Sequence, residues 1–227
     1  MKILGQSQRL IAALFLAITL ASGFALAAPP QNKFVSVKDL GAVLRSENLD
    51  AAVKTLNDIK WMSYKGEILP FVEDLWNLRK DKHPNVAWHI AEKPIIRLEL
   101  ANILLQARRN GTMKFDPSPM ADLAAKQLAS RDRWNHISAI SVLGLTESEM
   151  AVDEILKEAK REDWNTFRMA VTSLVHMCHP KAKDAVAELL ETVEDDSQLA
   201  FITATKQQWD DYTRSLMLCE NVKQRLK

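Results

Sequence analysis

Apolar residues recur at spacings of three and four along most of the chain, and this spacing predicts amphipathic helices. In residues 94–109, for example, Ile96, Leu100, Ile103 and Leu104 fall on one helical face. Alternating polar and apolar stretches, which are typical of strands, are almost absent. The sequence therefore predicts an all-α protein, with helices over residues 37–56 (broken at 46–48), 66–78, 86–91, 94–109, 118–130, 134–143, 146–160, 164–177, 181–193 and 195–222.

Several of these helices carry recognisable start signals. Ser118-Pro119 combines a capping residue with a proline suited to the first helical position. Thr146 and Glu149 have the spacing of a capping box, which places a helix start at Thr146. Asp195 starts the last helix. These signals predict short turns between the helices.

The helical pattern repeats along the chain. At an offset of 30 residues, segment 120–135 aligns with segment 150–165, and the alignment pairs Trp134 with Trp164. At an offset of 34, segment 151–156 aligns with 185–190. Each unit is a helix, a turn and a second helix, and one such pair cannot bury its apolar face alone. We therefore expect stacked helix pairs, with both tryptophans buried between repeats.

The repeats over residues 94–193 resemble the HEAT-like (armadillo-type) family, in the short form of the phycobilisome-lyase repeats. The first helices of the repeats lie at 96–105, 137–143 and 167–174, and the second helices begin at Ser118, Thr146 and His179. The aspartate that often precedes the second helix in this family is present only as Asp116. The resemblance implies a right-handed α-solenoid (superhelix) of antiparallel helix pairs, with residues 37–93 as a degenerate repeat or cap and residues 194–227 as a C-terminal capping helix.

The resemblance also implies a surface that binds another protein or a peptide. The second helices usually line this surface in the family. Their polar positions in this sequence are Asp122, Lys126, Asp153, Lys157, Asp184 and Glu188.

The first 27 residues predict a cleavable export signal. Lys2 and Arg9 precede an uncharged run over residues 10–21, and Ala25 and Ala27 supply the small residues of a cleavage site. The run is short for a membrane-spanning helix, which needs about 20 residues. We expect a mature chain that starts at Ala28 with a short linker over residues 28–36, has no membrane segment, and works in the periplasm or outside the cell.

The charge balance does not favour nucleic acid as a partner. Loss of Lys2 and Arg9 reduces the 30 basic residues to 28, against 29 acidic residues, so the mature net charge is about −1. Nucleic-acid-binding domains usually carry a clear positive excess or a basic face. Binding to an anionic membrane surface is equally unsupported by this balance.

The two cysteines, Cys178 and Cys219, are candidates for a disulfide in an oxidising compartment, and two free buried thiols are the alternative. His176, Cys178 and His179 could together ligate copper or zinc, but their spacing matches no closed zinc site. We therefore expect neither a metal nor a cofactor.

These patterns favour a non-catalytic scaffold or adaptor that binds a protein or peptide. The chain has no nucleophile elbow, no HExxH motif and no phosphate-binding loop. One alternative is a metal-handling envelope protein that uses His176, Cys178 and His179. The other is a bilin-lyase-like enzyme, for which Cys178 is the candidate thiol within the repeats.

Overall fold

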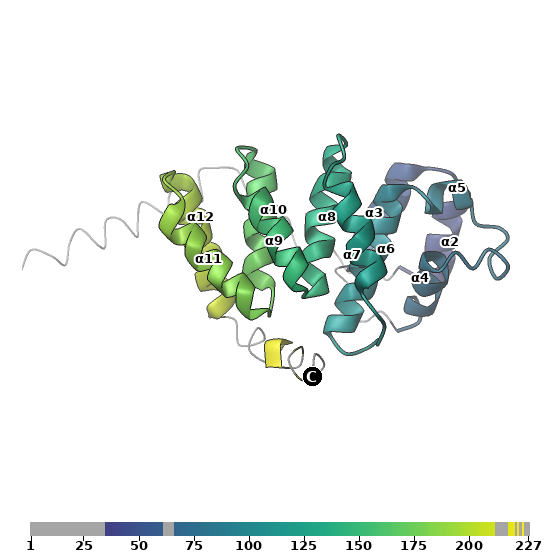
Figure 1. Cartoon of the computed structure of the whole chain (residues 1–227). Helices are drawn as coiled ribbons and strands as arrows, with labels where there is room; N and C mark the ends of the chain where they lie inside the picture. Colours follow the sequence, from purple (N-terminus) through teal and green to yellow (C-terminus); the bar gives the residue numbers. More distant parts are fainter. Residues whose placement is uncertain (1–34, 61–65, 212–217, 221, 223, 225–227) are drawn as a thin grey trace, which may run out of the picture. The chain divides into compact units, whose positions relative to one another are not determined.

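The computed structural model describes residues 35–60, 66–211, 218–220, 222 and 224, and all of them belong to one compact unit over residues 35–227. Within these residues the regular structure is helical (Figure 1). The predicted export signal and the first part of the predicted linker lie outside the described residues. No helix in the described part of the chain is long and apolar enough to span a membrane. The helices are α2 (Val37–Arg45), α3 (Leu49–Lys60), α4 (Leu69–Trp76), α5 (Trp88–Ala91), α6 (Pro94–Arg109), α7 (Ser118–Gln127), α8 (Arg133–Thr146), α9 (Glu149–Ala159), α10 (Trp164–His176), α11 (Pro180–Thr192) and α12 (Asp196–Asp210).

From α6 onward the helices pack in two rows. In the first row α8 packs between α6 and α10, and α10 packs in turn against α12 (Figure 1). In the second row α7 contacts α6 and α8, α9 contacts α8 and α10, and α11 contacts α10 and α12. Each second-row helix thus covers the junction between two first-row helices. The helix α3 continues the first row, because it packs against α6.

Helix caps set the register of the repeat. Asp132 and Asp163 cap α8 and α10 by accepting hydrogen bonds from the backbone of Asn135 and Thr166. The N-caps of α9 and α11 are Ser148 and His179. These two caps are 31 residues apart, as are Asp132 and Asp163. This separation exceeds the offset of 30 by one position. The alignment at offset 30 is therefore one residue out of register.

This register separates the two tryptophans. Trp164 is the first residue of α10, whereas Trp134 is the second residue of α8. Consecutive helical residues point about 100° apart. Trp164 stacks on the fully buried Phe167, with ring centroids 5.5 Å apart, and is 40% exposed, but Trp134 is 70% exposed. The prediction that both tryptophans are buried is wrong, since Trp164 is only partly covered and Trp134 is largely open.

Two helix boundaries also differ from prediction. Thr146 is the last residue of α8, and its hydroxyl donates back to the carbonyl of Leu143 at 2.7 Å. The N-cap of α9 is Ser148, whose side chain accepts from the backbone N–H of Ala151. A hydroxyl at 146 and one at 148 both precede the same apolar face, so the local pattern could not separate them. The last helix, expected to reach about residue 222, ends at Asp210.

The first-row helices α8 and α10 approach closely at Gly144. A Cβ atom placed there would lie 2.8 Å from the Cβ of Ser173 and 3.3 Å from its Cα. Neither atom can move without moving α10. The close packing of α8 and α10 therefore requires glycine at this position. Backbone conformation is not the reason, because Gly144 does not have a positive φ.

We expect Gly144→Ala to lower the free energy of unfolding by about 1–3 kcal/mol, because the added methyl group separates two packed helices. Urea denaturation measures this. The matched control is Gly41→Ala in α2, where the added Cβ meets only the end of the Arg45 side chain at 3.4 Å and the ring of Phe71 at 3.9 Å. The control should be neutral or stabilising, since alanine favours helix over glycine. Equal effects at the two positions would contradict the close approach.

Candidate binding groove

A groove of about 610 Å³ crosses the first-row helices. The helix α3 contributes one face, spaced at three and four residues, and α6, α8 and α10 contribute the remainder. Most of the side-chain surface that faces the groove is apolar. The lining residues are Leu49, Asp50, Val53, Lys54, Asn57, Lys60, Ile95, Glu99, Asp132, Trp134, Ile137, Ser138, Ser141 and Met169.

Trp134 stands at one rim of this groove. The cap at Asp132 fixes the start of α8, and this start directs position 134 away from the contacts that Trp164 makes in α10. The result is a large aromatic side chain with 70% of its surface exposed. Tryptophan is among the residue types that most often contribute a large share of the binding energy at protein interfaces.

The floor of the groove holds a buried ion pair. Lys60 of α3 lies 2.6 Å from Glu99 of α6, and Glu99 is only 3% exposed. Ser138 of α8 donates to the other oxygen of Glu99 at 2.9 Å. A second polar link joins α6 to α8, since Asn102 donates to Ser141 at 2.8 Å. These bonds fix the spacing of α3, α6 and α8, so the groove is preformed.

The six residues predicted to line a binding surface lie on the second-row helices, where the repeat pattern placed them, and none of them lines this groove. Asp122 and Lys126 lie on α7, Asp153 and Lys157 on α9, and Asp184 and Glu188 on α11. The register set by the caps places Asp122, Asp153 and Asp184 at equivalent positions.

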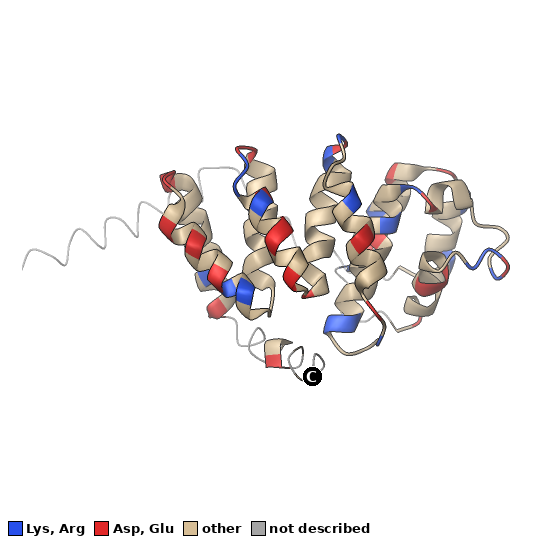
Figure 2. Cartoon of the chain, viewed as in Figure 1, with Lys and Arg blue, Asp and Glu red and all other residues tan. Residues whose placement is uncertain are grey.

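Three of these six residues form ion pairs within the protein. Asp153 of α9 pairs with Lys181 of α11 at 2.8 Å. Lys160, which directly follows α9, pairs with Glu188 of α11 at 2.7 Å. Lys157 pairs with Glu154 at 2.6 Å, and this hydrogen bond raises the pKa of Lys157. Figure 2 shows acidic and basic residues together along this row. These ion pairs connect second-row residues to one another. The groove is more apolar than this charged row.

A second polar site lies where α6, α8 and α10 end. Arg109, at the end of α6, pairs with Glu147 at 3.0 Å, and both side chains are buried. Arg109 also donates to the carbonyl of His176 at 2.6 Å, and Glu147 accepts from the backbone N–H of Cys178 at 2.7 Å. Burial lowers the pKa of Arg109 and raises that of Glu147, while the charge of each partner opposes both shifts.

Glu147 adopts a left-handed backbone conformation, with φ of 58°, at the C-cap of α8. Glycine or asparagine is usual at such a position, because a larger L-residue is strained there by about 1–2 kcal/mol. The two buried bonds of the Glu147 carboxylate account for a glutamate at this position. A helix end without glycine was the one sequence signal that could have indicated this site.

The three possible metal ligands, His176, Cys178 and His179, make three different contacts within the protein. The ring of His176 packs on Trp209 with centroids 4.5 Å apart, and burial lowers the pKa of His176. His179 caps α11. Cys178 and Cys219 are joined in a disulfide. Among the described residues, no group of three or more His, Cys, Asp or Glu side chains is arranged to hold a metal ion.

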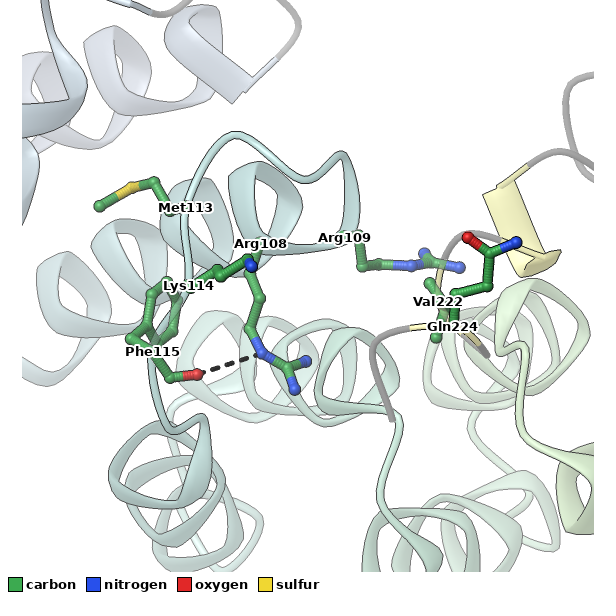
Figure 3. Close-up of a pocket in the computed structure, with 7 residues that line it drawn as sticks. All are labelled: Arg108, Arg109, Met113, Lys114, Phe115, Val222 and Gln224. Atoms are coloured by element: carbon green, nitrogen blue, oxygen red, sulfur yellow. Dashed lines mark hydrogen bonds between the residues drawn. The ribbon is translucent and has the colours of Figure 1, made fainter. Parts of the chain in front are cut away.

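A smaller pocket of about 340 Å³ lies beside the buried ion pair. Its lining residues are Arg108, Arg109, Met113, Lys114, Phe115, Val222 and Gln224. Figure 3 shows Arg109 extending toward Val222 and Gln224, whereas the Arg108 side chain runs in a different direction and donates to the carbonyl of Phe115 at 3.2 Å. Residues near the C-terminus thus lie over the Arg109 site.

No protein-family model matches this chain, and neither the curated proteins nor the solved structures contain a significant match.

Proposed function

We propose that this protein is a non-catalytic adaptor that binds an extended segment of another protein in the groove between α3, α6, α8 and α10. The observation that carries this proposal is the 70% exposure of Trp134 at the rim of a preformed, mostly apolar groove. Aromatic rings at such positions supply large contact area for an incoming side chain. A volume of about 610 Å³ lies within the range of about 300–1,000 Å³ that is typical of ligand-binding pockets.

The polar residues of the groove favour a peptide over a purely apolar ligand. Asn57, Ser138 and Ser141 line it and offer donors and acceptors for a peptide backbone. Asp50 and Asp132 also line it, whereas Lys54 is paired with Asp58 and Lys60 with Glu99. The groove therefore favours a segment that presents a large apolar side chain next to a lysine or arginine, which can face Trp134 and the two aspartates.

The proposal includes the architecture and the compartment. The two rows of helices and the constant register of their caps support a right-handed α-solenoid of HEAT-like repeats, in which a groove across several repeats is a common binding surface. The N-terminal sequence supports export to the periplasm or outside the cell. Mass spectrometry of the protein isolated from its cells tests this part, because retention of residues 1–27 contradicts it.

We expect Trp134→Ala to weaken peptide binding about 30-fold, roughly 2 kcal/mol, without changing the stability of the fold by more than about 0.5 kcal/mol. Peptides selected from a random dodecapeptide phage library provide the ligands, and fluorescence anisotropy measures their affinity. Met150→Ala is the matched control, because Met150 is 42% exposed and lies on α9 outside the groove. Selection of no peptide, or equal losses in the two variants, would refute the groove as the binding site.

A further inference from the structure

The two sulfur atoms of the Cys178–Cys219 disulfide have different surroundings. Cys178 is only 3% exposed, whereas Cys219 is half-buried. Cys219 lines a cavity of about 490 Å³ between α10, α11 and α12, and Cys178 does not. A thiolate that enters this cavity therefore reaches the sulfur of Cys219 first.

The cavity is large enough for a small thiol compound or for the exposed cysteine of another protein. Its walls carry charges of both signs, from Lys183, Lys206, Asp210 and Glu220. Lys206 and Asp210 form an ion pair at 2.5 Å. The remaining lining residues include apolar side chains of α10 and α11 and the ring of Trp209. The cavity that an incoming thiolate enters thus holds two lysine side chains and two carboxylates.

The buried sulfur of Cys178 lies beside a permanent positive charge. The Nη2 atom of Arg109 is 3.5 Å from the Sγ atom of Cys178. In thiol–disulfide exchange the departing sulfur leaves as a thiolate, and a nearby cation stabilises it and speeds its departure. Further charged or titratable groups around this point are Glu147, Arg108, His176 and His179. Burial raises the pKa of Glu147, whose carboxylate accepts from the backbone N–H of Cys178.

We propose that the Cys178–Cys219 disulfide is a thiol-exchange site of fixed direction, in which an incoming thiolate attacks Cys219 and Cys178 leaves beside Arg109. The bond between the two protein sulfurs breaks, and a bond forms between Cys219 and the incoming sulfur. When the reductant is a dithiol, its second thiolate then attacks the mixed disulfide and releases Cys219. The protein disulfide gains two electrons, and the dithiol is oxidised to its own disulfide. The exchange removes the covalent link between Cys219 and the loop that precedes α11.

Mapping of the first adduct tests the direction of exchange. The oxidised mature protein is incubated with reduced glutathione, quenched with iodoacetamide under denaturing conditions, digested and analysed by mass spectrometry. Glutathione should occupy Cys219, with the alkyl group on Cys178, in at least a tenfold excess over the reverse arrangement. Equal or reversed labelling overturns the proposal, as does the absence of any adduct until the protein is denatured.

A second measurement tests the role of Arg109 as a positioning residue. In the Cys219→Ser variant, the thiolate absorbance of Cys178 near 240 nm is followed against pH. The thiol should titrate below the value of about 8.5 of a free cysteine, and addition of Glu147→Gln should lower its pKa further because the competing carboxylate is gone. Titration above 8.5 in both variants overturns the stabilisation of the leaving thiolate by Arg109.

Discussion

Arg109→Met is expected to lower the free energy of unfolding by roughly 3–5 kcal/mol, since it leaves the partner carboxylate buried without a counter-charge. Arg109 pairs with Glu147 at 3.0 Å, and both side chains are shielded from water. The substitution also removes the donor to the carbonyl of His176. Methionine retains much of the volume of the arginine stem, so the loss arises mainly from the uncompensated polar groups.

The double variant Arg109→Met with Glu147→Gln separates the charge effect from packing. The glutamine keeps an acceptor for the backbone N–H of Cys178 and has no charge that requires compensation. We expect the double variant to be at least about 2 kcal/mol more stable than Arg109→Met alone. Arg108→Met is the matched control, because Arg108 is adjacent on α6 but only partly buried, and its loss should be below about 1 kcal/mol. Additive effects of the two substitutions, measured by guanidinium denaturation, would show that the pair is not coupled.

The sequence predicted the helices well because their signals are local. The apolar spacing located each helix, and His179 caps α11 where the prediction starts that helix. At α7 the predicted cap, Ser118, is one position too late, because Pro117 is the N-cap and Ser118 is the first helical residue and makes no cap hydrogen bond. The helical rows follow from the same spacing, since each amphipathic helix needs a neighbour for its apolar face. The repeat length was harder to obtain, because matches of residue identity favoured an offset of 30. The caps at Asp132 and Asp163, which fix the backbone, lie one position further apart than that offset.

The candidate sites were beyond local reasoning because long-range contacts create them. The helices α4 and α5 separate Lys60 from Glu99 along the chain, and α7 and α8 separate Arg109 from Glu147. Nothing near any of these four residues in the sequence identifies its partner. The polar residues of the second row were predicted as the binding surface because charged positions on a helix face can be recognised from the sequence. The groove of the first row combines half-buried apolar side chains from four helices, and those positions cannot be distinguished from core by spacing alone.

Cys219→Ser is expected to lower the free energy of unfolding by about 4 kcal/mol, because the disulfide closes a loop with a sequence separation of 41 residues. The cross-link restricts the unfolded chain, so the effect should appear mainly as a loss of stability without a change in helix content. Guanidinium denaturation monitored by circular dichroism measures it. The substitution is made at Cys219 because this residue is half-buried, and Cys178→Ser would add the effect of a new hydroxyl at a buried position.

Reduction of the wild-type protein provides the control for this variant. With dithiothreitol, the wild type should fall to within about 0.5 kcal/mol of Cys219→Ser, while the variant itself should not respond to the reductant. Equal stabilities of the oxidised wild type and the variant would mean that the two cysteines are not bonded in solution. A response of the variant to dithiothreitol would place the effect of the reductant elsewhere. Since Val222 is buried and contributes to the pocket beside Arg109, loss of the cross-link should also increase hydrogen exchange at the backbone N–H of Cys178, which donates to Glu147.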